Sequence, residues 1–262
     1  MLHPSLTIAL KAARNAGDII LRALEFLDRI TFTEKSTHNY VSEVDKLAER
    51  EIINVLRASF PSHGILGEES GHHPGDDHVW IIDPLDGTCN FMHGVPHFCV
   101  SIALQHKGRL EHALVYDPIR QEVFSASRGQ GAQLNDKRIR VSKTALLNDA
   151  LLSTGFPYHT HALLQPYLHI FQTLLPVAAG IRRPGSAALD LAYVAAGRFD
   201  GFWEFNLQAW DIAAGALLVK EAGGLVGDLN GEEHYLETGH VVAGNPKIFK
   251  QLLQVIKPIA TP

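Results

Sequence analysis

Short apolar runs bounded by turn residues occupy the middle of this 262-residue chain. Val79–Ile82 and Cys99–Leu104 are two of them, and Leu110–Tyr116 is joined to Gln121–Ser127 through Asp117-Pro118. Runs of this length and composition are typical of buried β-strands, and the Asp-Pro connection predicts a hairpin. Because longer segments with helical spacing lie on both sides, the chain is expected to fold as a mixed α/β (α+β) layered protein.

Helical spacing of apolar residues is clearest near the N-terminus. It predicts an amphipathic helix over residues 5–27 and a second one that starts at Ser42 and ends at Phe60-Pro61. Ser42 and Asp45 have the spacing of a capping-box variant. Four more helices are expected near residues 161–175, 185–197, 210–222 and 246–256. Further strands are expected at Ile65-Leu66, between Gly129 and Val141, and at Ala150–Ser153, Gly201–Trp203, Leu225–Val226 and Val241–Ala243.

Composition narrows the class of function. Hydrophobic residues make up 46% and charged residues 19%, which is ordinary for a globular protein. The net charge of −5 provides no basic field for a nucleic-acid backbone, so direct nucleic-acid binding is not expected. No stretch reaches the roughly 18 apolar residues of a membrane span, so no membrane association is expected. Two cysteines without CxxC spacing, Cys89 and Cys99, favour a reduced, cytoplasmic setting.

Two carboxylates follow the apolar run 79–82. Asp83 and Asp86 would face opposite sides of a continuous strand, so they converge only if the chain turns between them. Pro84 and Gly87 are residues that favour such a turn. Two close carboxylates repel each other, so a cation is their natural occupant, and oxygen ligands favour Mg²⁺ or Mn²⁺.

Other acidic residues stand at the ends of predicted elements. Glu68 and Glu69 follow a predicted strand, and Asp211 follows Trp210 at a predicted helix start. Taken singly, they would be a solvated loop and a helix cap; together with Asp83 and Asp86 they predict a metal site. Leu85 stands where an aspartyl-phosphate phosphatase needs its second Asp, so no covalent phospho-aspartate is expected.

Two further clusters have simpler interpretations. His72-His73 with Asp76–His78 could imitate a metal site, but they lack zinc-site spacing and are interpreted as solvated surface residues. Arg182-Arg183 suits either a phosphate clamp or an ion pair, and the sequence does not decide between them.

Three acidic motifs occur in order: GEES at 67–70, WIIDPLDGTCNF at 80–91 and WDIAAG at 210–215. With the segments 181–204 and 243–246, they make the chain resemble the inositol monophosphatase family, most closely its bacterial SuhB-type members. The resemblance implies a layered αβαβα sandwich of the inositol monophosphatase/fructose-1,6-bisphosphatase type, and usually a homodimer. It also implies one compact catalytic unit, in which residues 1–143 carry most metal ligands and residues 144–262 complete the site.

The resemblance assigns ligands to two or three Mg²⁺ ions. One ion would be held by Glu68, Asp83 and the carbonyl of Leu85, and a second by Asp83, Asp86 and Asp211. A weaker third ion would lie near Glu68. The outer region of this third ion would comprise Lys35, Asp45 and Glu69.

The resemblance also assigns catalytic and substrate roles. Glu68, Thr88 and Asp83 would be catalytic, with an activated water near Glu68 and Thr88 attacking phosphorus. Cys89 replaces a threonine of many members and is expected to pack as a small buried residue. The substrate would contact Asp86, Gly87, Thr88, Gly185, Ala187, Glu204 and Asp211.

The implied activity is Mg²⁺-dependent, lithium-sensitive hydrolysis of myo-inositol monophosphates and related polyol or sugar phosphates. Sibling specificities remain open: fructose-1,6-bisphosphate, histidinol phosphate or 3′-phosphoadenosine phosphate. A regulatory alternative also remains, because some bacterial members are associated with RNA polymerase and antitermination factors. The acidic net charge favours a protein partner over RNA in that case.

Overall fold

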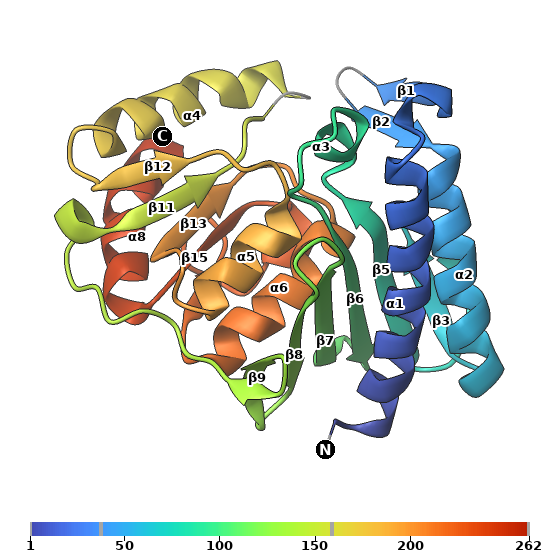
Figure 1. Cartoon of the computed structure of the whole chain (residues 1–262). Helices are drawn as coiled ribbons and strands as arrows, with labels where there is room; N and C mark the ends of the chain where they lie inside the picture. Colours follow the sequence, from blue (N-terminus) through green and yellow to red (C-terminus); the bar gives the residue numbers. More distant parts are fainter. Residues whose placement is uncertain (1, 37–38, 158–159, 261–262) are drawn as a thin grey trace.

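The computed structural model describes residues 2–36, 39–157 and 160–260, without the side chains of residue 29, residues 32–41, His161 and Ala260. Within these residues the chain forms two large sheets, a separate two-stranded hairpin and three layers of helices, and the large sheets and helices are stacked in the order helix, sheet, helix, sheet, helix (Figure 1). Three buried apolar clusters fill the spaces between these layers. The expected mixed α/β class and αβαβα sandwich are therefore confirmed.

The first outer layer consists of α1 (Pro4–Leu24) and α2 (Glu43–Ser59), which pack on one face of an eight-stranded sheet (Figure 1). The capping box is present: Ser42 N–H donates to Asp45 Oδ2 at 2.8 Å, and Val44 N–H donates to Ser42 Oγ at 3.1 Å. The strands of this sheet, in spatial order, are β10 (Lys137–Arg138), β9 (Gly131–Leu134), β8 (Glu122–Ser127), β7 (Arg109–Asp117), β6 (Cys99–His106), β5 (His78–Asp86), β3 (Gly64–Gly67) and β4 (Gly71–His73).

The middle layer consists of α5 (Ala187–Ala195) and α6 (Ala209–Glu221), which lie between the two sheets (Figure 1). Both helices are apolar on nearly all sides, as expected for helices covered on two faces. They approach closely because Gly215 faces Leu191, where a Cβ would lie 2.5 Å from Leu191 Cβ. This layer holds the start of each helix beside the end of β5.

The second sheet has five strands and is covered on its outer face by α4 (His161–Leu174) and α8 (Pro246–Ala260). Tyr167, Trp203 and Leu252 are buried in the cluster between sheet and helices. The spatial order is β12 (Gly180–Arg182), β11 (Leu151–Thr154), β13 (Gly201–Glu204), β15 (Val241–Gly244) and β14 (Leu225–Gly227).

Several short elements carry no periodic signal in the sequence and were not predicted from it. The first predicted helix also ends earlier than expected, at Leu24. The missed elements are the hairpin β1–β2 (Phe32–Ser36 and Asn39–Ser42), β4, α3 (Thr88–Met92), β12 and α7 (Tyr235–Thr238).

The first sheet uses residues up to Arg138, and the second starts at Leu151. Because α5 and α6 pack on strands of both sheets, the division at residues 143/144 remains a prediction about folding units. Among the described helices, none is both long and apolar enough to cross a membrane.

Candidate active site

The two aspartates of β5 lie on either side of an irregularity in the sheet. Asp83 pairs with Ser101 of β6 and Asp86 pairs with Cys99, so β5 advances three residues while β6 advances two. The extra residue is a β-bulge, which cancels the alternation that would place Asp83 and Asp86 on opposite faces. Asp83 Oδ1 accepts the N–H of Leu85 at 2.9 Å and closes this turn. β5 runs on to Asp86, so the turn expected between the two aspartates takes the form of a bulge within the strand.

The residues after the bulge start the short helix α3. Gly87 has φ of 98°, and a Cβ there would lie 3.0 Å from the carbonyl oxygen of His97, so only glycine fits. Thr88 Oγ1 lies 3.0 Å from Leu85 O and 3.0 Å from Asp45 Oδ1, and donates its single hydrogen to one of them at a time. Asp45, at the first turn of α2, thereby reaches the site.

The pairing of β3 with β5 positions Glu68. The two strands run parallel, with Gly67 beside Ile82, so the following residues, Glu68 just after the end of β3 and Asp83 within β5, lie side by side. Glu68 N–H donates to Ile82 O at 3.2 Å. This register places the carboxylate of Glu68 next to that of Asp83, as the sequence predicted for the metal site.

Glu49 of α2 holds the turn that carries Glu68. Its carboxylate accepts the N–H of Glu69 at 2.9 Å and of Ser70 at 2.8 Å, and it is only 2% exposed. A Cβ at Gly67 would lie 2.6 Å from Glu49 Oε2, so the strand end fits closely around this side chain. Glu49 was not predicted from the sequence, where its only signal is a charged residue on the apolar face of α2.

The middle helices supply Asp211 and the partners of Asp86. Asp211 Oδ2 accepts the N–H of Gln208 at 2.7 Å, so it caps α6 as well as facing the site. Asp86 Oδ2 accepts Ser186 Oγ–H at 2.7 Å and the N–H of Ala188 at 2.7 Å. Ala187, predicted to contact the substrate, lies between these two partners at the start of α5.

The four carboxylates interact electrostatically. Burial raises the pKa of Asp83 well above its usual value, and the charges of Glu68, Asp86 and Asp211 raise it further. Burial and the charge of Asp86 likewise raise the pKa of Asp211 well above its usual value. An oxygen-only donor set whose members oppose one another's ionisation fits a hard divalent cation such as Mg²⁺.

A second group of residues surrounds Glu204, at the end of β13. Burial raises the pKa of Glu204 to about 8, and the charge of Arg183 opposes this rise. Both arginines are exposed; Arg183 lies over the ring of Phe156, 5.4 Å from its centroid, and Arg182 donates to Ile181 O at 3.2 Å. Of the arginine pair, the structure therefore brings Arg183 toward Glu204.

Asn90 links the two halves of the site and was missed in the sequence. Its Nδ2 donates to His97 O at 2.7 Å and to Pro184 O at 2.8 Å, which ties α3 to the loop before α5. Gly185 in that loop has φ of 96°, a conformation that favours glycine. The asparagine lies in the predicted motif, but its partner across the site, Pro184, is 94 residues away and gives no local signal.

The remaining expectations concern Cys89 and the residues assigned to the outer region of a third ion. Cys89 is exposed, so its expected role as a buried packing residue is wrong; α3 turns it outward, and Cys99 is the buried cysteine. Glu69 is partly buried beside Glu68, and Asp45 contacts Thr88. Lys35 lies in β1, but its side chain falls outside the described residues, so its place near a third ion stays a prediction.

Fold and site together define a layered αβαβα protein of the inositol monophosphatase/fructose-1,6-bisphosphatase type. The inositol monophosphatase family model matches residues 1–259, and the chain belongs to that family.

Named relatives are similar over almost the whole chain. A protein named Nus factor SuhB from Pseudomonas aeruginosa is 57% identical over 267 residues, covering 100% of this chain and 98% of the relative. The crystal structure of extragenic suppressor protein suhB from Bartonella henselae has a TM-score of 0.94 at 44% identity, covering 96% of this chain and 98% of that one. The inositol monophosphatase structure from Anabaena has a TM-score of 0.83 at 37% identity, covering 97% and 95%.

Proposed function

We propose that this chain is a Mg²⁺-dependent phosphatase that hydrolyses myo-inositol monophosphates and related polyol or sugar phosphates. The observation that carries the proposal is the set of four mutually repelling carboxylates at the end of β5. Membership of the inositol monophosphatase family supports the same reaction class. The substrate and the metal are our inference from these two findings.

In this proposal Glu68, Asp83, Asp86, Asp211 and the carbonyl of Leu85 hold two Mg²⁺ ions. When bound, Mg²⁺ makes a nearby water more acidic and offsets negative charge on the phosphate. A weaker third ion belongs to the same proposal.

The remaining steps fall to the protein's own groups. Thr88 and Asp45 lie within hydrogen-bond distance of each other, and we assign this pair to orienting the attacking water and accepting its proton. The N–H groups of Gly87 and Thr88, at the start of α3, orient the phosphate. As the water oxygen bonds to phosphorus, the bond to the alcohol oxygen breaks, and that oxygen would take its proton from a solvent water on the side of Asp211.

We assign the alcohol to the space between Gly185, Ala187 and Glu204. Glu204 would form hydrogen bonds with its hydroxyl groups, and the nearby charge of Arg183 influences that carboxyl group. Since these contacts select only for a hydroxylated ring or chain, the specificity within polyol phosphates requires a direct test.

The decisive experiment is phosphate release by wild type and Asp83→Asn, with Asp18→Asn as an exposed control on α1. Asp83→Asn should abolish nearly all turnover while the thermal unfolding curve still shows a folded protein. EDTA should abolish wild-type activity, added Mg²⁺ should restore it, and lithium should inhibit it. Full activity in EDTA, or a fully active Asp83→Asn variant, would contradict the proposal.

The substrate assignment needs a panel at equal concentrations: myo-inositol 1-phosphate, fructose-1,6-bisphosphate, histidinol phosphate and 3′-phosphoadenosine phosphate. We expect the highest kcat/KM for the inositol phosphate. A sibling substrate that exceeds it tenfold would replace this assignment while leaving the reaction class unchanged.

A second proposal rests on the name of the Pseudomonas relative, Nus factor SuhB. We infer a protein partner in the transcription machinery, bound independently of catalysis. A pulldown with Asp83→Asn should recover RNA polymerase or its elongation factors as wild type does, and a pulldown that recovers neither would refute this partner. The cytoplasmic setting and the homodimer stay predictions, which fractionation and sedimentation would test.

A further inference from the structure

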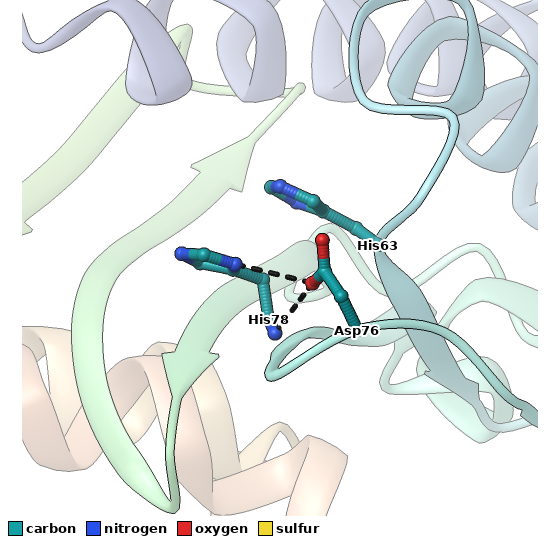
Figure 2. A group of neighbouring side chains, drawn as sticks. All are labelled: His63, Asp76 and His78. Carbon is teal, nitrogen blue, oxygen red and sulfur yellow. Dashed lines mark hydrogen bonds and ion pairs between the residues drawn. The ribbon is translucent and has the colours of Figure 1, made fainter.

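The amino-terminal ends of β3 and β5 bring together a group that the sequence did not connect. His63, Asp76 and His78 each offer one ligand atom, and these atoms lie within 4.8 Å of one another. Figure 2 shows the Asp76 carboxylate beside both imidazole rings. The cluster thus offers two imidazoles and one carboxylate to a single ion.

The parallel register of the two strands creates the cluster. Gly64 of β3 pairs with Val79 of β5, so the preceding residues, His63 and His78, lie side by side. Their rings stack with centroids 4.6 Å apart. The same pairing places Glu68 beside Asp83 at the other end, so one strand pair carries both groups.

Asp76 is held in place by three neighbouring groups. Its Oδ1 accepts the N–H of His78 at 2.8 Å and lies 3.1 Å from His78 Nδ1, while its Oδ2 accepts Ser62 Oγ–H at 2.7 Å. Two ligands of a tetrahedral ion with bonds of about 2.0–2.1 Å lie about 3.3 Å apart. His78 Nδ1–H donates to Asp76 Oδ1 across 3.1 Å, so an ion bound to both atoms would replace this proton with little change in their spacing.

His63 is held by a buried tryptophan. Trp80 Nε1 is a donor only, and it lies 3.1 Å from His63 Nδ1, so this nitrogen presents its lone pair. Phe60 also stacks on the His63 imidazole, at 4.8 Å between centroids. An ion bound through His63 Nδ1 must displace the hydrogen bond from Trp80. Binding of the ion should therefore change the fluorescence emission of Trp80.

The surroundings leave room for further ligands. A cavity of about 370 Å³ adjoins the cluster and is lined also by His106, His112 and Glu111. His106 stacks on His78 at 4.1 Å between centroids. Three protein ligands and an accessible cavity correspond to a site whose fourth position is open to water.

We propose that His63, Asp76 and His78 form a binding site for a divalent transition metal of borderline softness, of which Zn²⁺ is the representative. Mixed imidazole and carboxylate ligands favour Zn²⁺ over Mg²⁺, because Mg²⁺ prefers oxygen donors alone. His78 and Asp83 are five residues apart on β5, roughly 17 Å at the rise of an extended strand. The site is therefore separate from the carboxylate group and does not depend on the proposed phosphatase reaction.

The test is calorimetric titration of Zn²⁺ into the full-length protein saturated with Mg²⁺, with Trp emission followed in parallel. His63→Ala, His78→Ala and Asp76→Asn are the variants, and His169→Ala on the exposed face of α4 is the matched control. We expect one Zn²⁺ equivalent in wild type and in the control, and binding weakened about tenfold or more in each variant. The emission change should disappear in His63→Ala.

Repeating the titration with Asp83→Asn separates this site from the carboxylate group, since its Zn²⁺ equivalent should persist there. The Mg²⁺-dependent phosphatase activity of His78→Ala should equal that of wild type. Asp76→Asn keeps an acceptor oxygen for His78 N–H, so it remains informative if an alanine variant unfolds. No Zn²⁺ binding by wild type, or equal binding in Asp76→Asn and wild type, would overturn the proposal.

Discussion

Glu49→Gln tests how strongly a buried residue of α2 determines the metal affinity of Glu68. The Glu49 carboxylate accepts two backbone N–H groups of the turn, from Glu69 at 2.9 Å and from Ser70 at 2.8 Å. Glutamine offers one oxygen and one NH₂ group at the same positions. One turn N–H therefore loses its acceptor and faces another donor.

The magnitude follows from the type of hydrogen bond. A hydrogen bond to a charged group contributes about 1.5–3 kcal/mol, and about 1.4 kcal/mol corresponds to a tenfold change in an equilibrium constant. Losing one of them should raise the Mg²⁺ concentration for half-maximal activity about 10-fold to 150-fold. At saturating Mg²⁺, kcat should remain close to that of wild type, because Glu49 does not contact the substrate in the proposed site.

The assay is phosphate release as a function of Mg²⁺ concentration. Glu51→Gln is the matched control, since it lies on the same helix and accepts Asn15 Nδ2–H at 2.8 Å away from the turn. Thermal unfolding of each variant reports on folding. If Glu49→Gln and Glu51→Gln give the same Mg²⁺ dependence as wild type, the proposed role of Glu49 is wrong.

Three further predictions concern the substrate side. Burial raises the pKa of Glu204 from 4.5 to about 8, so the stability that its protonated form contributes is complete below pH 4.5 and is lost as the pH rises through 8. In EDTA, the Tm of wild type should therefore fall between these pH values. The Tm of Glu204→Gln should fall less steeply. Gly155→Ala places a Cβ on the Glu204 carboxylate, so kcat/KM for the inositol phosphate should fall about tenfold or more, whereas unchanged kinetics would contradict this packing. Asn90→Ala removes the hydrogen bonds to His97 O and Pro184 O and should lower the free energy of unfolding by about 1–3 kcal/mol in urea titrations.

The fold was predictable where patterns are local. Helical spacing and the Ser42–Asp45 capping box predicted where α2 begins, and the Asp117-Pro118 turn predicted the β7–β8 hairpin. The elements α3 and β12 have five and three residues, too few for a periodic signal, and they form because neighbouring strands and loops support them. Tertiary contacts therefore determine whether the shortest helices and strands form.

The candidate carboxylates were predictable for a similar reason. Asp83 and Asp86 adjoin residues that bend the chain, and turn chemistry depends on only a few neighbouring residues. The supporting residues were not predictable, because Glu49 holds a turn that begins 20 residues away and Asn90 ties α3 to Pro184, 94 residues away. Cys89 was assigned to the interior because cysteine is usually buried, but the orientation of α3 exposes it.

By itself, the sequence determined the strand and helix types, the bend at Asp83–Asp86 and an excess of carboxylates that a cation must balance. Those properties depend on backbone conformation and charge within short segments. Only the tertiary structure decided which residues meet across the sheet. The parallel register of β3 and β5 places Glu68 beside Asp83 at one end and His63 beside His78 at the other, because strand pairing aligns residues that no local pattern connects.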